Sequence, residues 1–329
     1  MKKVLPIHMG GTISSVKTAT GAKPGLSFSD LLDRLRKDSD GETAAVLSNL
    51  SIADVLTPLG AHGVASSSIR IPHVQLLVKA IMDHYNSYDA FVITHGTDTM
   101  AFTASMLSFG LRHIKKPVII TGSQKLPEEA GSDAMANLGD AFVAASSGIG
   151  GVWLVFNGQV INAVRVTKVD TQSLDAFVST QRDEKSISEF LIGHNPATEN
   201  EIFSSHFSTD VDIFYLSQTI SAQCLQQYLA IRNPQALIVL VYGLGGQSED
   251  IWDVLGEWVK SGHIVVAKSQ CVFGETDLNK YAVGRQAADR GILSASHMSL
   301  EASFAKLSYM LGNSIIDSAF SKIQSEPER

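Results

Sequence analysis

The sequence predicts an α/β protein with two domains. We expect a larger N-terminal α/β domain with a parallel-dominated sheet over residues 1–182, a linker over 183–211, and a smaller C-terminal α/β domain over 212–329. In both halves, short apolar runs rich in β-branched residues alternate with stretches of helical spacing, which is the pattern of βαβ units. The chain also has 329 residues, more than a single core usually supports.

The first predicted strand is the short apolar run over residues 3–8, which leads into a turn over 9–14. Two glycines in this turn allow the backbone to bend sharply and to approach a ligand closely. Thr12 is therefore predicted at the carboxyl end of the first strand. The segment 15–25 is small, polar and broken by Gly and Pro, so we predict a mobile loop and a candidate lid.

Two helices are predicted before the next strand, a short amphipathic one from Phe28 to Leu35 and a longer one over residues 69–87. Three serines, residues 66–68, precede the second helix. They either cap it and form a loop or hydrogen-bond a substrate carboxylate. Residue chemistry alone favours the cap.

The central feature of the chain is the stretch over residues 88–109. Its apolar run, 90–94, predicts a buried strand, and the polar turn 95–99 leads into a helix that starts at Met100. In open α/β sheets, ligands bind at such carboxyl ends of strands, and a helix start attracts anions. Thr and Asp are also ordinary cap residues, so this turn alone does not establish a site.

The pattern continues with a strand over 117–124 that ends in a Gly turn, a helix from residue 131 through Phe142, and a strand over 151–156. Lys168 follows in a polar segment, and taken alone it is expected to be a solvated lysine. Residues 182–210, which include His194, Asn195 and Pro196, are charged and lack periodicity, so they are assigned to the linker.

The second half repeats the pattern with strands over 213–216, 236–241 and 264–267 and helices over 222–231, 249–260 and 299–311. The turn 242–246, which follows the middle strand, suggests a dinucleotide site. However, it lacks the third glycine at the required spacing and an acidic residue about 20 residues further on. We therefore expect no NAD and no other cofactor.

Composition bears on the expected metal sites, partners and location of the protein. Cys224 and Cys271 are the only cysteines and lie in no metal-binding pattern, so we expect no disulfide framework or metal site and predict two small core residues. The formal charge of −7 argues against nucleic acid or an anionic membrane as a partner. No run reaches the roughly 18 apolar residues of a membrane span, and the N-terminal apolar run is too short for a signal peptide, so a cytoplasmic location is predicted.

Several motifs together resemble the bacterial-type L-asparaginase/glutaminase family, in its cytoplasmic type I branch. The resemblance covers nearly the whole chain and rests on residues 10–13, 95–99, 121–124, 132–134, 269–271 and 281–284, with Asn137 and Lys168. It implies a small amino-acid substrate and a homodimer or homotetramer in which each site lies near the dimer interface.

The resemblance also assigns roles. It implies that Thr12 is the nucleophile and that Thr97, Asp98 and Lys168 form a second catalytic group. A hydroxyl is a poor nucleophile unless it is activated, and a lysine acts as a base only when it is neutral. Asp98 is expected to hold the substrate ammonium and to orient Lys168. The implied substrate-binding residues are Gly11, Ser66, Ser67, Gly96, Thr97, Asp98 and Ser123, with backbone N–H groups near Gly11 and Thr97 stabilising an oxyanion.

Three positions depart from the family pattern. Ala22 stands where relatives usually have a tyrosine, Gly246 where they have an asparagine, and Ala65 where they have an aspartate. The expected function is hydrolysis of L-asparagine to L-aspartate and ammonia through a threonine nucleophile. Two alternatives stay open: a related amidase acting on glutamine or another side-chain amide, and a catalytically weak homologue that binds or senses an amino acid.

Overall fold

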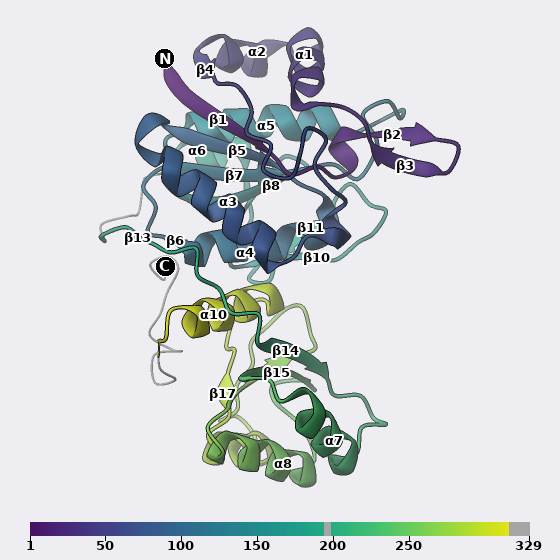
Figure 1. The fold of residues 1–329 in the computed structure, drawn as a ribbon, viewed down its shortest axis with the longest axis vertical. Helices are drawn as coiled ribbons and strands as arrows, with labels where there is room; N and C mark the ends of the chain where they lie inside the picture. The colour runs from purple at the N-terminus through teal and green to yellow at the C-terminus, as the bar shows by residue number, and fades with distance from the viewer. Residues whose placement is uncertain (194–198, 316–329) are drawn as a thin grey trace. The chain divides into compact units, whose positions relative to one another are not determined.

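The computed structural model describes residues 1–193 and 199–315. They form two compact units, one spanning residues 1–206 and one beginning at Phe207 (Figure 1). Both units combine parallel strands with helices, so the predicted two-domain α/β class is confirmed.

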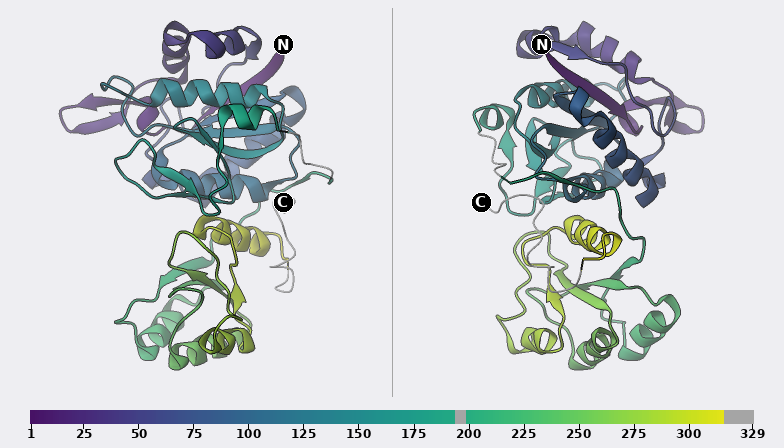
Figure 2. Two further views of the ribbon diagram at one scale, coloured as in Figure 1. Left: turned by 180° about the vertical axis from the view of Figure 1, so that it is seen from behind. Right: turned by 60° about the vertical axis from the view of Figure 1, so that its left-hand side comes forward.

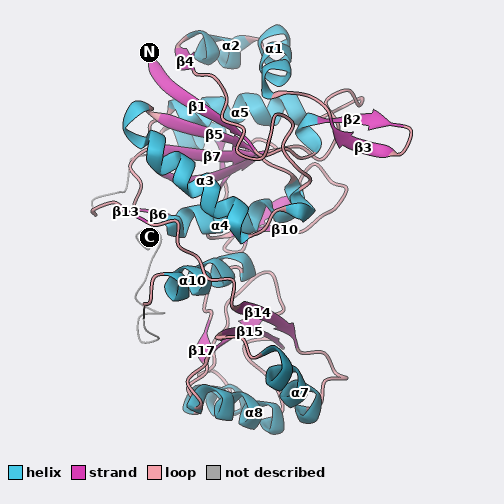
Figure 3. Ribbon diagram, in the orientation of Figure 1, coloured by secondary structure: helices cyan, strands magenta, loops and turns pink. Residues whose placement is uncertain are grey.

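The larger unit is built on a seven-stranded sheet (Figure 3). Its strands, in spatial order, are β12 (Lys185–Ser186), β9 (Gln159–Asn162), β8 (Gly151–Phe156), β7 (Pro117–Thr121), β5 (Ala90–Thr94), β1 (Lys2–His8) and β4 (Leu50–Ile52). The five strands from β8 to β4 are parallel, whereas β9 runs antiparallel to both of its neighbours. The carboxyl ends of β1, β5 and β7 therefore meet at one edge.

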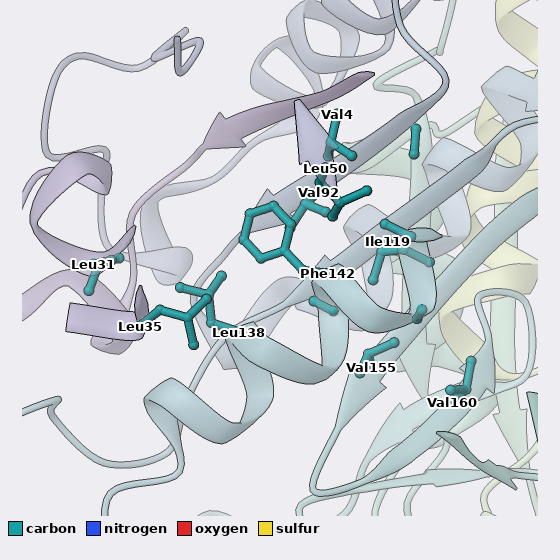
Figure 4. Packing of buried hydrophobic residues seen from close by; sticks show 14 of the residues in the cluster. Val4, Leu31, Leu35, Leu50, Val92, Ile119, Leu138, Phe142, Val155 and Val160 are labelled. Carbon is teal, nitrogen blue, oxygen red and sulfur yellow. The ribbon is translucent and has the colours of Figure 1, made fainter. Parts of the chain in front are cut away.

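Helices cover both faces of this sheet (Figure 2). On one face α5 (Ala134–Ser146) packs on the central strands, and α1 (Phe28–Asp38), α2 (Gly41–Ser48) and α6 (Ile187–Leu191) pack on α5. On the other face lie α3 (Ile71–His84) and α4 (Met100–Gly110). Phe142 of α5 is fully buried and points toward Val92 and Ile119 of the sheet (Figure 4). Burying such a side chain contributes about 1.5–3 kcal/mol.

The predicted mobile loop over residues 15–25 is instead a β-hairpin, formed by β2 (Ser15–Thr18) and β3 (Gly21–Pro24). Gly21 has φ 110°, which supplies the left-handed residue of the turn. A methyl group at Gly25 would lie 2.6 Å from Val16 Cγ2, so the end of the hairpin packs closely on its first strand. The small residues of this segment suggested a loop, but its two halves pair with each other as antiparallel strands.

The predicted linker over 183–211 also contains regular structure. Strand β12 extends the large sheet, and α6 begins with a capping box between Ser186 and Glu189 and buries Phe190 in the core. Further on, β13 (Ile202–Phe203) pairs with β6 (Leu111–Arg112). The sequence of this segment shows no periodicity because its helix and strands are each only a few residues long. His194, Asn195 and Pro196 lie outside the described residues.

The smaller unit has a four-stranded parallel sheet. Its strands, in spatial order, are β14 (Val211–Tyr215), β15 (Ala236–Val241), β16 (Ile264–Ser269) and β17 (Leu293–Ser294), and its helices are α7 (Ala222–Arg232), α8 (Glu249–Lys260), α9 (Ala282–Asp289) and α10 (Leu300–Gly312). Trp252 of α8 is fully buried in its core. Helix α9 and strand β17, which span eight and two residues, were not predicted from the sequence.

The prediction of buried cysteines is wrong, because Cys224 and Cys271 are both exposed. Cys224 lies on α7 next to the buried Leu225 but one position off the apolar stripe, and Cys271 lies just beyond the end of β16. Across the described parts of both units, no helix is long and apolar enough to cross a membrane.

Candidate active site

The two threonine turns begin at neighbouring strand ends. Strands β1 and β5 pair in parallel, with His8 opposite Thr94. Beyond them the backbones of Gly11 and Gly96 touch so closely that a Cβ on Gly11 would lie 2.3 Å from Gly96 Cα. Only glycine fits there, because Gly11 also has φ 96°. Thr12 and Thr97 directly follow these two glycines, so both threonines lie next to the point where the two backbones touch.

Thr12 opens the 3-10 turn η1 (Thr12–Ser14) and is half-buried. Within the described part of the chain, its hydroxyl makes no hydrogen bond, whereas Ser14 and Ser15 both donate theirs to the Gly11 carbonyl. These two bonds satisfy the carbonyl of the turn and leave the Thr12 hydroxyl available for a substrate.

Thr97, Asp98 and Lys168 form one hydrogen-bonded cluster. Thr97 and Asp98 open the 3-10 turn η4 (Thr97–Thr99), and Lys168 ends β10 (Val166–Lys168), which pairs with β11 (Phe177–Ser179). Lys168 Nζ donates to Thr97 Oγ1 at 2.8 Å and to Asp98 Oδ1 at 2.9 Å. The Lys168 side chain is only 16% exposed, so it is not the solvated lysine that its local sequence suggests.

The electrostatics of the cluster favour an ionised Asp98. The hydrogen bond from Lys168 is the main cause that holds the pKa of Asp98 below its ordinary value, and a bond from Ser66 adds to it. Burial acts in the opposite direction but is outweighed, because the Asp98 side chain is 65% exposed. A carboxylate in this position is accessible to a ligand cation.

Ser66 belongs to the same cluster. It opens the 3-10 turn η2 (Ser66–Ser68), and its Oγ lies 3.3 Å from both the backbone nitrogen and Oδ2 of Asp98. Thr99 Oγ1 donates to the Ser66 carbonyl at 2.9 Å. Ser66 is not the cap of α3, because that helix begins at Ile71. Ser67 is exposed, and its carbonyl accepts a hydrogen bond from Arg70.

The turn after β7 brings Gln124 rather than the Ser123 hydroxyl to Thr97. Ser123 is fully buried and donates to the Lys125 carbonyl at 2.6 Å. Gln124 Oε1 accepts the Thr97 hydroxyl at 3.1 Å. From the sequence, Gln124 was predicted only as part of a motif. Its place in the turn after β7, a central strand that pairs in parallel with β5, was the signal that pointed to a site residue.

A buried polar network fixes this turn. The Asp133 carboxylate accepts the backbone N–H of Gln124 at 2.9 Å. Asn137 donates to Asp133 at 2.9 Å and to the Gly122 carbonyl at 3.0 Å, and it accepts the Asn157 N–H at 2.8 Å. Because buried polar groups are costly when unpaired, this fully paired network holds the turn after β7 rigid.

The nearby histidines are structural. His95 is fully buried between Thr103 and the Gly96 carbonyl, and burial lowers its pKa to about 4. His8 bonds Thr94 at 2.6 Å, and burial likewise lowers its pKa to about 4. Both rings are neutral at pH 7. Lys168 is therefore the better candidate for a base in the described cluster.

The three departures from the family pattern lie outside this cluster. Ala22 is exposed on β3, and Ala65 is exposed directly before Ser66. Gly246 lies in the smaller unit, where its N–H and carbonyl both bond to Tyr242. It lines a cavity of about 210 Å³ that contains no residue of the Thr97 cluster.

Comparison with known proteins agrees with this fold. A model of the asparaginase N-terminal domain matches residues 3–190, and a model of the glutaminase/asparaginase C-terminal domain matches residues 210–323. The L-asparaginase of Thermococcus kodakarensis is 31% identical over 94% of this chain and 93% of its own. Its solved structure superposes with a TM-score of 0.86 at 29% identity, covering 98% of both chains.

Two further relatives are informative. L-asparaginase 1 of Escherichia coli K12 is 36% identical over 77% of each chain. A subunit of the glutamyl-tRNA(Gln) amidotransferase of Thermoplasma volcanium is 28% identical over 95% of this chain and 76% of its own. Since the N-terminal model alone spans more than half of the sequence, the chain belongs to the asparaginase family of amidohydrolases, in the type I branch that its sequence predicts.

Proposed function

We propose that this protein hydrolyses L-asparagine to L-aspartate and ammonia, with Thr12 as the nucleophile. The observation that carries the proposal is the position of Lys168 Nζ, within hydrogen-bond distance of both Thr97 Oγ1 and Asp98 Oδ1. The close contact of Gly11 with Gly96 brings the Thr12 turn beside this cluster. A nucleophile, a base and a group that orients the base are the parts that acyl transfer requires.

In the first half-reaction, Thr12 Oγ1 attacks the carbonyl carbon of the side-chain amide. The C–N bond breaks, the amide nitrogen takes up the hydroxyl proton, and ammonia leaves an ester on Thr12. In the second half-reaction, water attacks that ester and restores the hydroxyl. Neutral Lys168 accepts a proton from Thr97 or from the attacking water, which is the task of a general base.

The remaining side chains bind the substrate. Asp98 is ionised and accessible, so it pairs with the substrate ammonium. Ser66 lies beside it and donates to the α-carboxylate. Backbone N–H groups of the Gly11 and Gly96 turns face the developing oxyanion, where one donor is worth roughly 10²–10³ in rate. We further propose a homodimer or homotetramer with the site near the dimer interface.

A related amidase is the second candidate. The similarity to a subunit of an amidotransferase leaves glutamine or another side-chain amide open as the substrate. Ala22 and Gly246, which stand where relatives have a tyrosine and an asparagine, also leave a weak amino-acid-binding homologue open. The predicted cytoplasmic location stays a prediction.

Ammonia release separates these candidates. The wild-type protein is assayed with L-asparagine, D-asparagine, L-glutamine and an N-substituted asparagine. We expect the highest kcat/KM with L-asparagine, and its loss in Thr12→Val. Thr20→Val is the matched control, because Thr20 is exposed in the turn of the β2–β3 hairpin. Tight binding of an amino acid without ammonia release from any amide would refute the hydrolase.

A further inference from the structure

The amide of Gln124 has a fixed orientation. Its Nε2 lies 3.1 Å from the Ser173 carbonyl and 3.4 Å from the Asp170 carbonyl. An amide NH₂ donates and a carbonyl oxygen only accepts, so the NH₂ group must face these two carbonyls. The opposite end, Oε1, then faces Thr97 and accepts its hydroxyl proton at 3.1 Å.

The hydrogen bonds of the cluster therefore run in one direction. Lys168 Nζ donates to Thr97 Oγ1, Thr97 donates to Gln124 Oε1, and Gln124 donates to the two loop carbonyls. Such aligned chains strengthen each of their members. Because a hydroxyl has a single proton, Thr97 cannot donate to Gln124 and to Lys168 at once.

We propose that Gln124 is a positioning residue that turns the Thr97 proton away from Lys168 and thereby keeps Lys168 as the donor in the substrate-free protein. The inference rests on the proposed function, in which Lys168 must become neutral to act as a base. A neutral Lys168 would accept the Thr97 proton, but only by breaking the bond to Gln124. Gln124 thus opposes the formation of the base until a substrate rearranges the chain.

Both ends of Gln124 are held firmly. Its backbone N–H bonds the Asp133 carboxylate at 2.9 Å. Asp170 Oδ1 accepts the N–H groups of Gln172 at 2.7 Å and Ser173 at 2.8 Å, which fixes the loop that carries the acceptor carbonyls. A rotation of Gln124 would break several bonds at once, so the direction of the chain is set by the fold.

The carboxylates around the cluster are Asp98, Asp133 and Asp170. Asp98 bonds Lys168 directly, Asp133 bonds the backbone of Gln124, and Asp170 is the exposed loop residue described above. None of them is altered by substitutions at Gln124. A change in the protonation of Lys168 in such variants therefore reports on the Gln124 side chain.

Two substitutions at this position have opposite predicted effects. Gln124→Met removes the acceptor, so Thr97 is free to donate to neutral Lys168, and the acid limb of kcat/KM should move to lower pH by about half to one unit, the equivalent of one hydrogen bond. Gln124→Glu adds a carboxylate that favours the ammonium, so the limb should move to higher pH. Gln172→Met, an exposed residue of the same loop, is the control and should not move it.

A titration of Lys168 that needs no turnover separates the positioning role of Gln124 from the proposed amide hydrolysis. The ¹³Cε signal of Lys168, assigned by its loss in Lys168→Met, is followed against pH in the wild-type protein and the Gln124 variants. The same opposite shifts support the positioning role even if the wild-type protein hydrolyses no amide, in which case only the proposed function fails. If Lys168 titrates identically in wild type and Gln124→Met, or if both variants shift it in the same direction, the role of Gln124 is overturned.

Discussion

Replacing Lys168 with methionine tests the proposed base, because it removes the ammonium but keeps most of the side-chain length. The lost contacts are the bonds of 2.8 Å to Thr97 and 2.9 Å to Asp98. Since Asp98 is 65% exposed, solvent screens this ion pair, and its contribution to stability is at most about 1 kcal/mol. The variant should therefore fold.

Activity should fall far more than stability. Loss of a general base typically costs about 10²–10⁴ in rate, or roughly 3–5 kcal/mol of activation free energy. The loss should appear in kcat, because the base acts in the transition state rather than in binding. Ammonia release over a range of asparagine concentrations measures kcat and KM separately, and circular dichroism during heating confirms the fold.

Lys79→Met is the matched control, because Lys79 lies on α3 of the same unit, pairs with Asp83 and has a side chain that is 64% exposed. It should change kcat by less than about twofold, as surface substitutions away from a site do. If Lys168→Met is folded and its kcat also stays within twofold of wild type, then Thr97, Asp98 and Lys168 are not one catalytic unit. Lys17 and Lys23 would then be the next candidates for the base.

Three other outcomes concern the scaffold. Gly11→Ala should lower the unfolding free energy in urea by about 1–3 kcal/mol more than Gly21→Ala, because both positions have positive φ but only Gly11 meets neighbouring backbone; equal losses would contradict the close contact. Asn137→Leu should cost about 2–4 kcal/mol, since it leaves several buried partners unpaired, and a change below about 0.5 kcal/mol in the same assay would show that the network is dispensable. Burial lowers the pKa of His8 and of His95 from 6.5 to about 4, so the unfolded state binds more protons in this window; thermal unfolding should show stability falling as the pH drops from about 6.5 to 4, whereas rising stability would contradict neutral histidines.

The sequence predicted the edge of the sheet on which the cluster lies. The apolar run 90–94 predicted a buried strand that ends in a polar turn, and the structure places this strand beside β1. The Gly turn at residues 9–14 likewise ends its strand where expected. Strong local patterns, namely a β-branched run followed by a glycine turn, were sufficient for these elements.

Other features depend on contacts between distant residues. The position of Lys168 follows from the pairing of β10 with β11, which no local pattern indicates. Gln124 acquires its partners from Thr97 on one side and from the loop at Asp170 and Ser173 on the other. Burial of a polar side chain is a property of the tertiary fold, and residue type alone predicted the solvated state for Lys168.

An ester trapped during turnover identifies the nucleophile. The protein is mixed with asparagine, quenched in acid within the first turnover and after longer times, digested, and analysed by mass spectrometry. We expect an aspartyl ester on the peptide that contains Thr12, and no such ester in Thr12→Val. An ester on Thr97 or Ser66, with the Thr12 peptide unmodified, would show that Thr12 is not the nucleophile.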